Sequence, residues 1–116
     1  MIKNIKINND NISTQIIIKN NFIKKYQKRL LKNDKKVFCL IDSKLKKIFM
    51  DFVKIDNFNC FYIKCGENIK NINTFKSISN KLLEKNIDRN SVLVSIGGGT
   101  LGDLSGFIAS TILRGV

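Results

Sequence analysis

Near the start of the chain, hydrophobic residues change from an alternating to a helical spacing. Isoleucines alternate with polar residues over residues 1–7, and residues 14–18 form a β-branched run after the turn-prone segment 8–11. From Asn21 onward the apolar side chains recur at the spacing of one helix face, at Phe22, Ile23, Tyr26, Leu30 and Leu31. This pattern predicts a β-hairpin followed by an amphipathic helix.

Three largely apolar runs follow, at residues 37–41, 60–63 and 91–96, of which the first is continuous. Runs without alternation are typical of strands that are covered on both faces of a sheet. Segments with helical spacing lie between them, carrying first Leu45, Ile48, Phe49 and Phe52, and then Phe75, Ile78, Leu82 and Leu83. Asn73 or Thr74 is expected to cap the second of these helices.

The alternation of strands with short helices predicts βαβ crossovers and a mostly parallel sheet with flanking helices. The expected fold class is α/β and Rossmann-like, with the N-terminal hairpin and a last helix that reaches about Leu113. No repeat or low-complexity linker divides the chain, so we expect residues 1–116 to form one domain. Ligands of open parallel sheets bind at the carboxyl ends of the strands, which here carry Asp42, Gly66 with Glu67, and a glycine cluster.

Composition excludes several kinds of chemistry. A chain of 116 residues that is 43% hydrophobic and 26% charged has the composition of a globular domain and is too apolar to stay disordered. It contains no histidine, which excludes an imidazole base, a Ser-His pair and a His-ligated zinc within this chain. Cys39, Cys60 and Cys65 are odd in number and form no CxxC motif, so we expect reduced thiols.

The net charge of +12 suggests a nucleic acid or an anionic membrane as a partner, but its distribution favours a different explanation. All of the excess lies in residues 1–90, and 18 of the 21 basic residues are lysine. Abundant Lys, Asn and Ile are typical of an A/T-rich genome, so we do not expect nucleic acid binding. No signal peptide is evident, and the most apolar stretch, 104–113, is too short for a membrane span. We therefore expect a cytoplasmic protein.

The glycine cluster is the strongest candidate for a binding site. Residues 91–103 read Ser-Val-Leu-Val-Ser-Ile-Gly-Gly-Gly-Thr-Leu-Gly-Asp, an apolar strand that enters a glycine turn and then a helix. Glycine has no Cβ, so backbone N–H groups and the positive end of the helix can approach a pyrophosphate. The pattern indicates nucleotide binding, with a ligand-free tight turn as the alternative. It is neither the GxGxxG motif nor a Walker loop.

The other candidates have structural interpretations as well. Asp103 is suited to capping the last helix, and Asp42 to ending a strand in a turn. Glu67 and Lys70, three residues apart, are suited to a solvated ion pair. Arg114 is suited to an exposed position near the end of the chain. Taken one at a time, each of these residues is better explained by a structural role than by a functional one.

Taken in order, the same residues resemble a known family. Residues 96–115 closely resemble the GGG-x-x-G-D-x-x-G-F-x-A…RG motif of 3-dehydroquinate synthase, a sugar phosphate cyclase. Residues 65–70, Cys-Gly-Glu-Asn-Ile-Lys, resemble the G-E-x-x-K motif of that family, although Cys65 replaces its usual acidic or small polar residue. The resemblance covers the whole chain loosely and residues 63–116 well.

The resemblance implies an activity and a set of site residues. The family converts 3-deoxy-D-arabino-heptulosonate 7-phosphate to 3-dehydroquinate in the shikimate pathway of aromatic amino acid biosynthesis, eliminating phosphate as a carbon-oxygen lyase. It uses NAD and a divalent metal, zinc or cobalt. Arg114 matches a residue that contacts substrate phosphate in the neighbouring subunit of a homodimer. The expected cofactor-binding residues are Asp42, Gly66, Glu67, Lys70, Gly98, Gly99, Thr100, Leu101, Gly102 and Asp103.

The family's later motifs and its helical metal-binding domain have no counterpart in this sequence. We therefore expect the chain to be the NAD-binding part of a synthase, with no catalytic residues, no metal ligands and no activity alone, completed by another polypeptide region. Its last helix is expected to leave an apolar face uncovered. The alternatives are another sugar phosphate cyclase, an NAD domain like that of the iron-dependent alcohol and glycerol dehydrogenases, or a non-catalytic basic protein. Those dehydrogenases usually place Lys where Gly106 stands here, which favours the synthase.

Overall fold

The structure is a computed structural model of the chain, and it describes residues 3–9, 12–32, 34–50 and 58–116. Its contacts divide the chain into two compact units, Met1–Asn33 and Asp34–Val116. The assignment of the whole chain to one domain stays a prediction.

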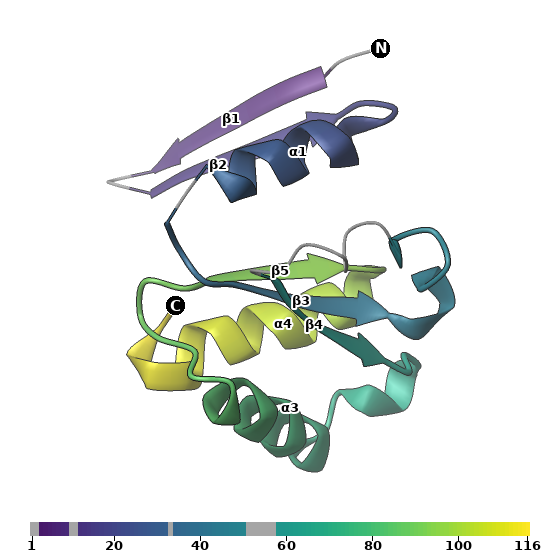
Figure 1. The fold of residues 1–116 in the computed structure, drawn as a ribbon, viewed down its shortest axis with the longest axis vertical. Helices are drawn as coiled ribbons and strands as arrows, with labels where there is room; N and C mark the ends of the chain where they lie inside the picture. Colours follow the sequence, from purple (N-terminus) through teal and green to yellow (C-terminus); the bar gives the residue numbers. More distant parts are fainter. Residues whose placement is uncertain (1–2, 10–11, 33, 51–57) are drawn as a thin grey trace. The chain divides into compact units, whose positions relative to one another are not determined.

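The first unit is the expected hairpin and helix (Figure 1). Strands β1 (Lys3–Asn9) and β2 (Ile12–Ile18) pair in antiparallel fashion, and α1 (Phe22–Leu31) follows. The register places isoleucines of both strands on one face of the hairpin, where they are 42–56% exposed: Ile5, Ile7, Ile16 and Ile18.

The second unit contains a parallel three-stranded sheet of order β4-β3-β5. Its strands are β3 (Val37–Asp42), β4 (Phe58–Ile63) and β5 (Val92–Ile96). The sheet confirms the predicted α/β class. Complete burial, expected for all three strands, holds only for β3, whose first five residues are at most 1% exposed. Strands β4 and β5 lie on either side of β3 and keep partly exposed residues, because each is an outer strand of the described sheet.

Two helices cover one face of this sheet. Helix α3 (Ile72–Glu84) and helix α4 (Gly99–Thr111) share a hydrophobic core with Phe38 and Leu40, which point to the same face of β3. A 3-10 turn, η3 (Ile112–Arg114), follows α4. The helices contribute to the core Ile78, Leu82, Leu101, Leu104 and Ile108. None of the helices in the described part of the chain is long and apolar enough to span a bilayer.

The segment after β3 differs from its predicted helix over residues 43–49. It begins as the 3-10 helix η1 (Ser43–Leu45), continues as turns and is helical at Met50, while Phe52 lies outside the described residues. The carboxylate of Asp42 accepts a hydrogen bond from the backbone N–H of Lys44 at 3.0 Å. Such a side-chain bond to the backbone competes with α-helical bonding, which explains the tight turn.

The N-cap of α3 is Asn71, so the prediction of Asn73 or Thr74 was wrong. The side-chain oxygen of Asn71 accepts the N–H of Thr74 at 2.9 Å. The helix begins before its apolar stripe does: its first residue, Ile72, is 71% exposed and does not belong to the buried face. Leu83, also expected on the buried stripe, is 44% exposed.

Replacing the observed cap tests this assignment. We expect Asn71→Ala to lower the free energy of unfolding by about 0.5–2 kcal/mol, because the N–H of Thr74 loses its acceptor. The matched control is Asn73→Ala, which lies inside α3 and should leave stability unchanged or slightly raised. Urea unfolding followed by circular dichroism measures both. A larger loss from Asn73→Ala would contradict the assignment.

Candidate functional site

The carboxyl ends of the three parallel strands lie side by side. Asp42 pairs with Ile63 in register, and Ile41 pairs with Ile96, so the strands end within one residue of each other. The segments that follow the strand ends surround a cavity of about 320 Å³. It is lined by Asp42, Cys65, Gly66, Glu67, Gly98, Thr100 and Leu101. The structure thus brings together most of the residues that the sequence placed at this edge.

Gly97, in the turn between β5 and α4, lies so close to its neighbours that a side chain would not fit without movement. A Cβ on Gly97 would lie 2.9 Å from Cδ2 of Leu101 and 3.3 Å from Cβ of Asp42. Leu101 is only 1% exposed and belongs to the core, so it has little room to move. Of the glycines in the described residues, Gly115 has a positive φ and those of this turn do not. The turn therefore needs glycine for space rather than for an unusual conformation.

The next two glycines expose the backbone at the start of α4. A Cβ on Gly98 or Gly99 would meet no atom within 4 Å. Gly98 is the N-cap of α4, it supplies no side-chain cap, and the first turn has no acidic residue. The N–H of Gly102 donates to the carbonyl oxygen of Gly98 at 3.0 Å and is therefore part of the helix. The amides ahead of it, from Gly99 to Leu101, are thus available to an anion at the positive end of the helix.

Cys65 lines this cavity, although it was not among the predicted site residues. Its Sγ donates to the carbonyl oxygen of Ile63 at 3.4 Å. Burial, followed by the nearby Asp42 carboxylate, raises the pKa of the Cys65 thiol. The thiol is therefore protonated at neutral pH. The only signal in the sequence was that cysteine replaces the residue usual at this position.

Lys70 and Asp103 lie apart from the other predicted site residues. The ammonium of Lys70 binds Oδ2 of Asp103 at 2.8 Å, which joins the segment after η2 (Glu67–Ile69) to α4. Lys70 and Asp103 do not line the cavity that contains Asp42 and Glu67, and Asp103 lies beyond the first turn of α4 without capping it. The hydrogen bond and charge of Asp103 raise the pKa of Lys70.

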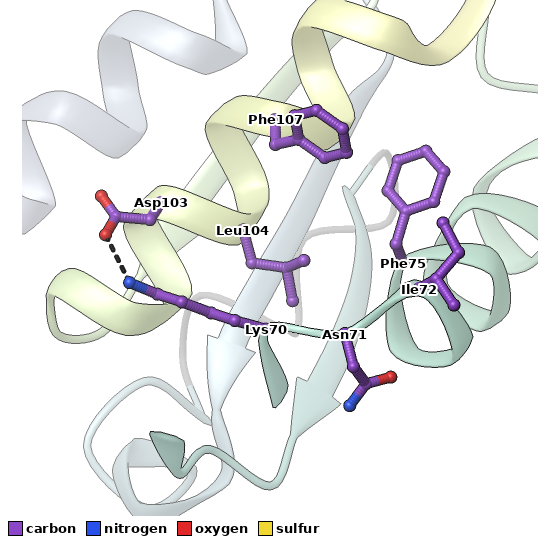
Figure 2. A pocket seen from close by; sticks show the side chains of 7 residues that line it. All are labelled: Lys70, Asn71, Ile72, Phe75, Asp103, Leu104 and Phe107. Carbon is purple, nitrogen blue, oxygen red and sulfur yellow. Dashed lines mark hydrogen bonds and ion pairs between the residues drawn. The ribbon is translucent and has the colours of Figure 1, made fainter. Parts of the chain in front are cut away.

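The ion pair lies at the rim of a second pocket, between α3 and α4 (Figure 2). This pocket has a volume of about 320 Å³. The rings of Phe75 and Phe107 lie across it with their centroids 5.1 Å apart, and Leu104 lies between the two helices. Phe107 is 55% exposed, so the last helix does carry an uncovered apolar side chain.

Arg114 does not approach the cavity. It is exposed and belongs to η3, beyond the carboxyl end of α4, whereas the glycine turn lies at the amino end. The 13 residues of α4 alone rise by about 20 Å. Any contact between Arg114 and a ligand would therefore involve a different site.

The two expected cofactors differ in how they fit this chain. Open backbone amides beside a carboxylate suit a nucleotide diphosphate and ribose. A divalent transition metal has no suitable donor set, because the sequence lacks histidine and no three Cys, Asp or Glu side chains gather within the described residues.

A single methyl group at Gly97 tests the packing beneath the turn. We expect Gly97→Ala to lower the free energy of unfolding by about 1–3 kcal/mol, because the buried Leu101 side chain must move. Gly106→Ala is the matched control: its Cβ would enter open space within α4, which should raise stability by about 0.5–1 kcal/mol. Equal effects of the two variants in urea unfolding would rule out the close contact.

Titration tests the Lys70–Asp103 pair. The pair stabilises the fold below the ordinary lysine pKa of 10.5, and this contribution is lost as the pH rises through the higher pKa of folded Lys70. We expect Asp103→Asn to return the pKa of Lys70 toward 10.5, as read from its side-chain NMR signals. Asp88→Asn, which removes the partner of Lys36, should leave Lys70 unchanged. An unaltered Lys70 titration in Asp103→Asn would show that the pair does not form.

Comparison with known proteins links this geometry to one family. Residues 60–116 match the family model described as 3-dehydroquinate synthase N-terminal. The 3-dehydroquinate synthases of Clostridium tetani and Pelagibacter ubique are each 36% identical to this chain, over 99% and 97% of its length. That of Thermoplasma volcanium is 37% identical over 97%. The chain spans about a third of the length of these relatives, 32% in each case.

A solved structure shares the fold. The crystal structure of 2-deoxy-scyllo-inosose synthase complexed with carbaglucose-6-phosphate, NAD+ and Co2+ matches 98% of this chain and 33% of its own, with a TM-score of 0.79 and 16% identity. At that identity the match shows the fold alone. The family model and the sequence relatives confirm the resemblance found in the motifs: residues 60–116 correspond to the N-terminal part of 3-dehydroquinate synthases, and the chain as a whole is similar to about a third of such a protein.

Proposed function

We propose that this chain is the NAD-binding part of a 3-dehydroquinate synthase, which converts 3-deoxy-D-arabino-heptulosonate 7-phosphate to 3-dehydroquinate. One observation carries the proposal: the uncapped amino end of α4 opens into a cavity that also contains Asp42 and Glu67. The match of residues 60–116 to the family model gives this cavity its expected ligand.

The backbone at the glycine turn would hold the diphosphate of NAD. The amides of Gly99, Thr100 and Leu101 precede the first helical hydrogen bond, and open space in front of Gly98 admits phosphate oxygens. The side chain of Leu101 remains in the core and supports the turn from below.

The opposite wall of the cavity would hold the adenosine ribose. Asp42 accepts the N–H of Lys44 with one carboxylate oxygen, and a carboxylate has acceptor sites left for two vicinal hydroxyls. Gly66 and Glu67 line the same cavity. NAD, when bound, supplies a hydride acceptor for the transient oxidation of a substrate hydroxyl.

Three predicted contact residues take a positioning role in this proposal. The Lys70–Asp103 pair ties the loop after β4 to α4, and the N–H of Gly102 belongs to the helix. These residues keep the two walls of the cavity together rather than contacting the cofactor.

In this proposal the metal ligands and a partner subunit are supplied by other polypeptide regions. Because the sequence lacks histidine and the described residues hold no metal donor set, we expect the 116 residues alone to bind NAD without releasing phosphate from the substrate. We propose that Arg114 contacts the substrate phosphate of a partner subunit in a homodimer, and that another polypeptide region supplies the metal ligands. The position of Arg114 at the far end of α4 supports this role. The cytoplasmic location also stays a proposal.

The alternatives differ in substrate more than in fold. The match to 2-deoxy-scyllo-inosose synthase supports the broader class of sugar phosphate cyclases, while the sequence relatives favour 3-dehydroquinate synthase within it. A non-catalytic basic protein would bind polyanions through its lysines and show no affinity for NAD.

The cavity can be tested separately from stability. We expect the folded chain to bind NAD in calorimetric titration and Gly98→Ala to weaken binding about tenfold, because the new methyl group occupies the space of a phosphate oxygen. The loss of stability should stay below about 1 kcal/mol, because the new methyl group meets no protein atom and only the weaker N-cap preference of alanine counts against it. Gly106→Ala should bind NAD normally. Failure of the folded parent chain to bind NAD, or equal affinity in Gly98→Ala, would refute the proposed site.

A further inference from the structure

Two cysteines face each other across adjacent strands, away from the proposed NAD cavity. Cys39 of β3 and Cys60 of β4 are direct partners in the parallel register. Phe38 and Leu40, the neighbours of Cys39 in sequence, point into the core beneath α3 and α4. Because side chains alternate along a strand, Cys39 and Cys60 share the opposite face of the sheet.

The spacing of the strands suits a covalent bond between them. Neighbouring strands lie about 4.8 Å apart. Disulfides join residues whose Cα atoms are about 4.4–6.8 Å apart. The register of β3 and β4 is therefore compatible with a bond between Cys39 and Cys60.

The two thiols differ in access and in acidity. Cys39 is fully buried, whereas Cys60 is half-buried on β4, an outer strand of the described sheet. The interaction with the Cys39 thiol lowers the pKa of Cys60, while the interaction with Cys60 and burial raise that of Cys39. Thiolates that are partly accessible are the reactive ones in proteins, so Cys60 is suited to react first.

We propose that Cys39 and Cys60 form a peroxide-sensitive pair that closes to a reversible disulfide across β3 and β4. The thiolate sulfur of Cys60 attacks a peroxide oxygen, the O–O bond breaks, and Cys60 becomes a sulfenic acid as hydroxide leaves. The Cys39 thiol then gives up its proton as its sulfur attacks that of Cys60, so that the S–S bond forms and the oxygen leaves as water. This second step is slower than the first, because burial keeps Cys39 protonated until it reacts. The two thiols lose two electrons, and hydrogen peroxide is reduced to two waters.

The third cysteine serves as an internal control. Cys65 follows the end of β4, where Ile63 is paired with Asp42 rather than with a cysteine. Burial and the charge of Asp42 keep its thiol protonated. It should therefore react slowly with the same oxidant.

Tryptic mapping of the full chain after oxidation tests the pair. Cleavage after lysine separates the three cysteines into peptides 37–44, 55–64 and 65–70. After treatment with hydrogen peroxide and alkylation of free thiols, we expect a monomer lighter by two hydrogens before alkylation, with peptides 37–44 and 55–64 joined and Cys65 alkylated. A thiol reductant should restore the reduced chain. Cys65→Ser should form the same bond, and Cys60→Ser should not.

Two further measurements keep the proposal testable even if one of these variants fails to fold. In the native reduced parent chain, iodoacetamide should modify Cys60 roughly tenfold faster than Cys65. In Cys39→Ala, which has no resolving thiol, a dimedone-type probe should trap the sulfenic acid at Cys60. Equal alkylation rates for Cys60 and Cys65, a bond that includes Cys65, or linkage only between separate chains would overturn the proposal.

Discussion

The close contact of Gly97 with Leu101 and Asp42 is the constraint on which the candidate site depends. Leu101 is buried in the core between the sheet and α4, and its side chain occupies the place that a Cβ at Gly97 would need. This packing brings the amino end of α4 against the end of β3. The exposed amides of the turn and the carboxylate of Asp42 therefore open into one cavity. Apolar burial positions the polar groups, and no charge interaction is needed to hold the turn.

Electrostatic interactions in this unit connect elements that packing has already placed. Lys70 and Asp103 join the loop after β4 to α4 through side chains that are 45% and 71% exposed, so solvent screens their attraction. The positive end of α4 differs, because its N–H groups belong to the backbone and retain their orientation without side-chain ordering. The candidate site thus combines backbone N–H groups, which we propose as an anion cradle, with a weaker side-chain tie at its edge.

Periodicity in the sequence predicted the hairpin, three strands and main helices, because each buries a regularly spaced set of residues. Spacing along the sequence could not predict interactions between residues that are far apart in the chain. Glu67 and Lys70 are close in sequence, yet Lys70 pairs with Asp103, 33 residues away. The cap of α3 was missed because its first residue, Ile72, is exposed and lies off the apolar stripe. Motif order identified the family, while only the packing explains why Gly97 must be glycine.

Backbone NMR with pyrophosphate tests the anion cradle most directly, because it locates the ligand without relying on catalysis or on an intact substrate site. The account predicts the largest amide shift changes at Gly99, Thr100 and Leu101, with smaller changes near Asp42. Shifts confined to the lysine-rich helix α1, or the absence of any shift in a folded chain, would contradict it.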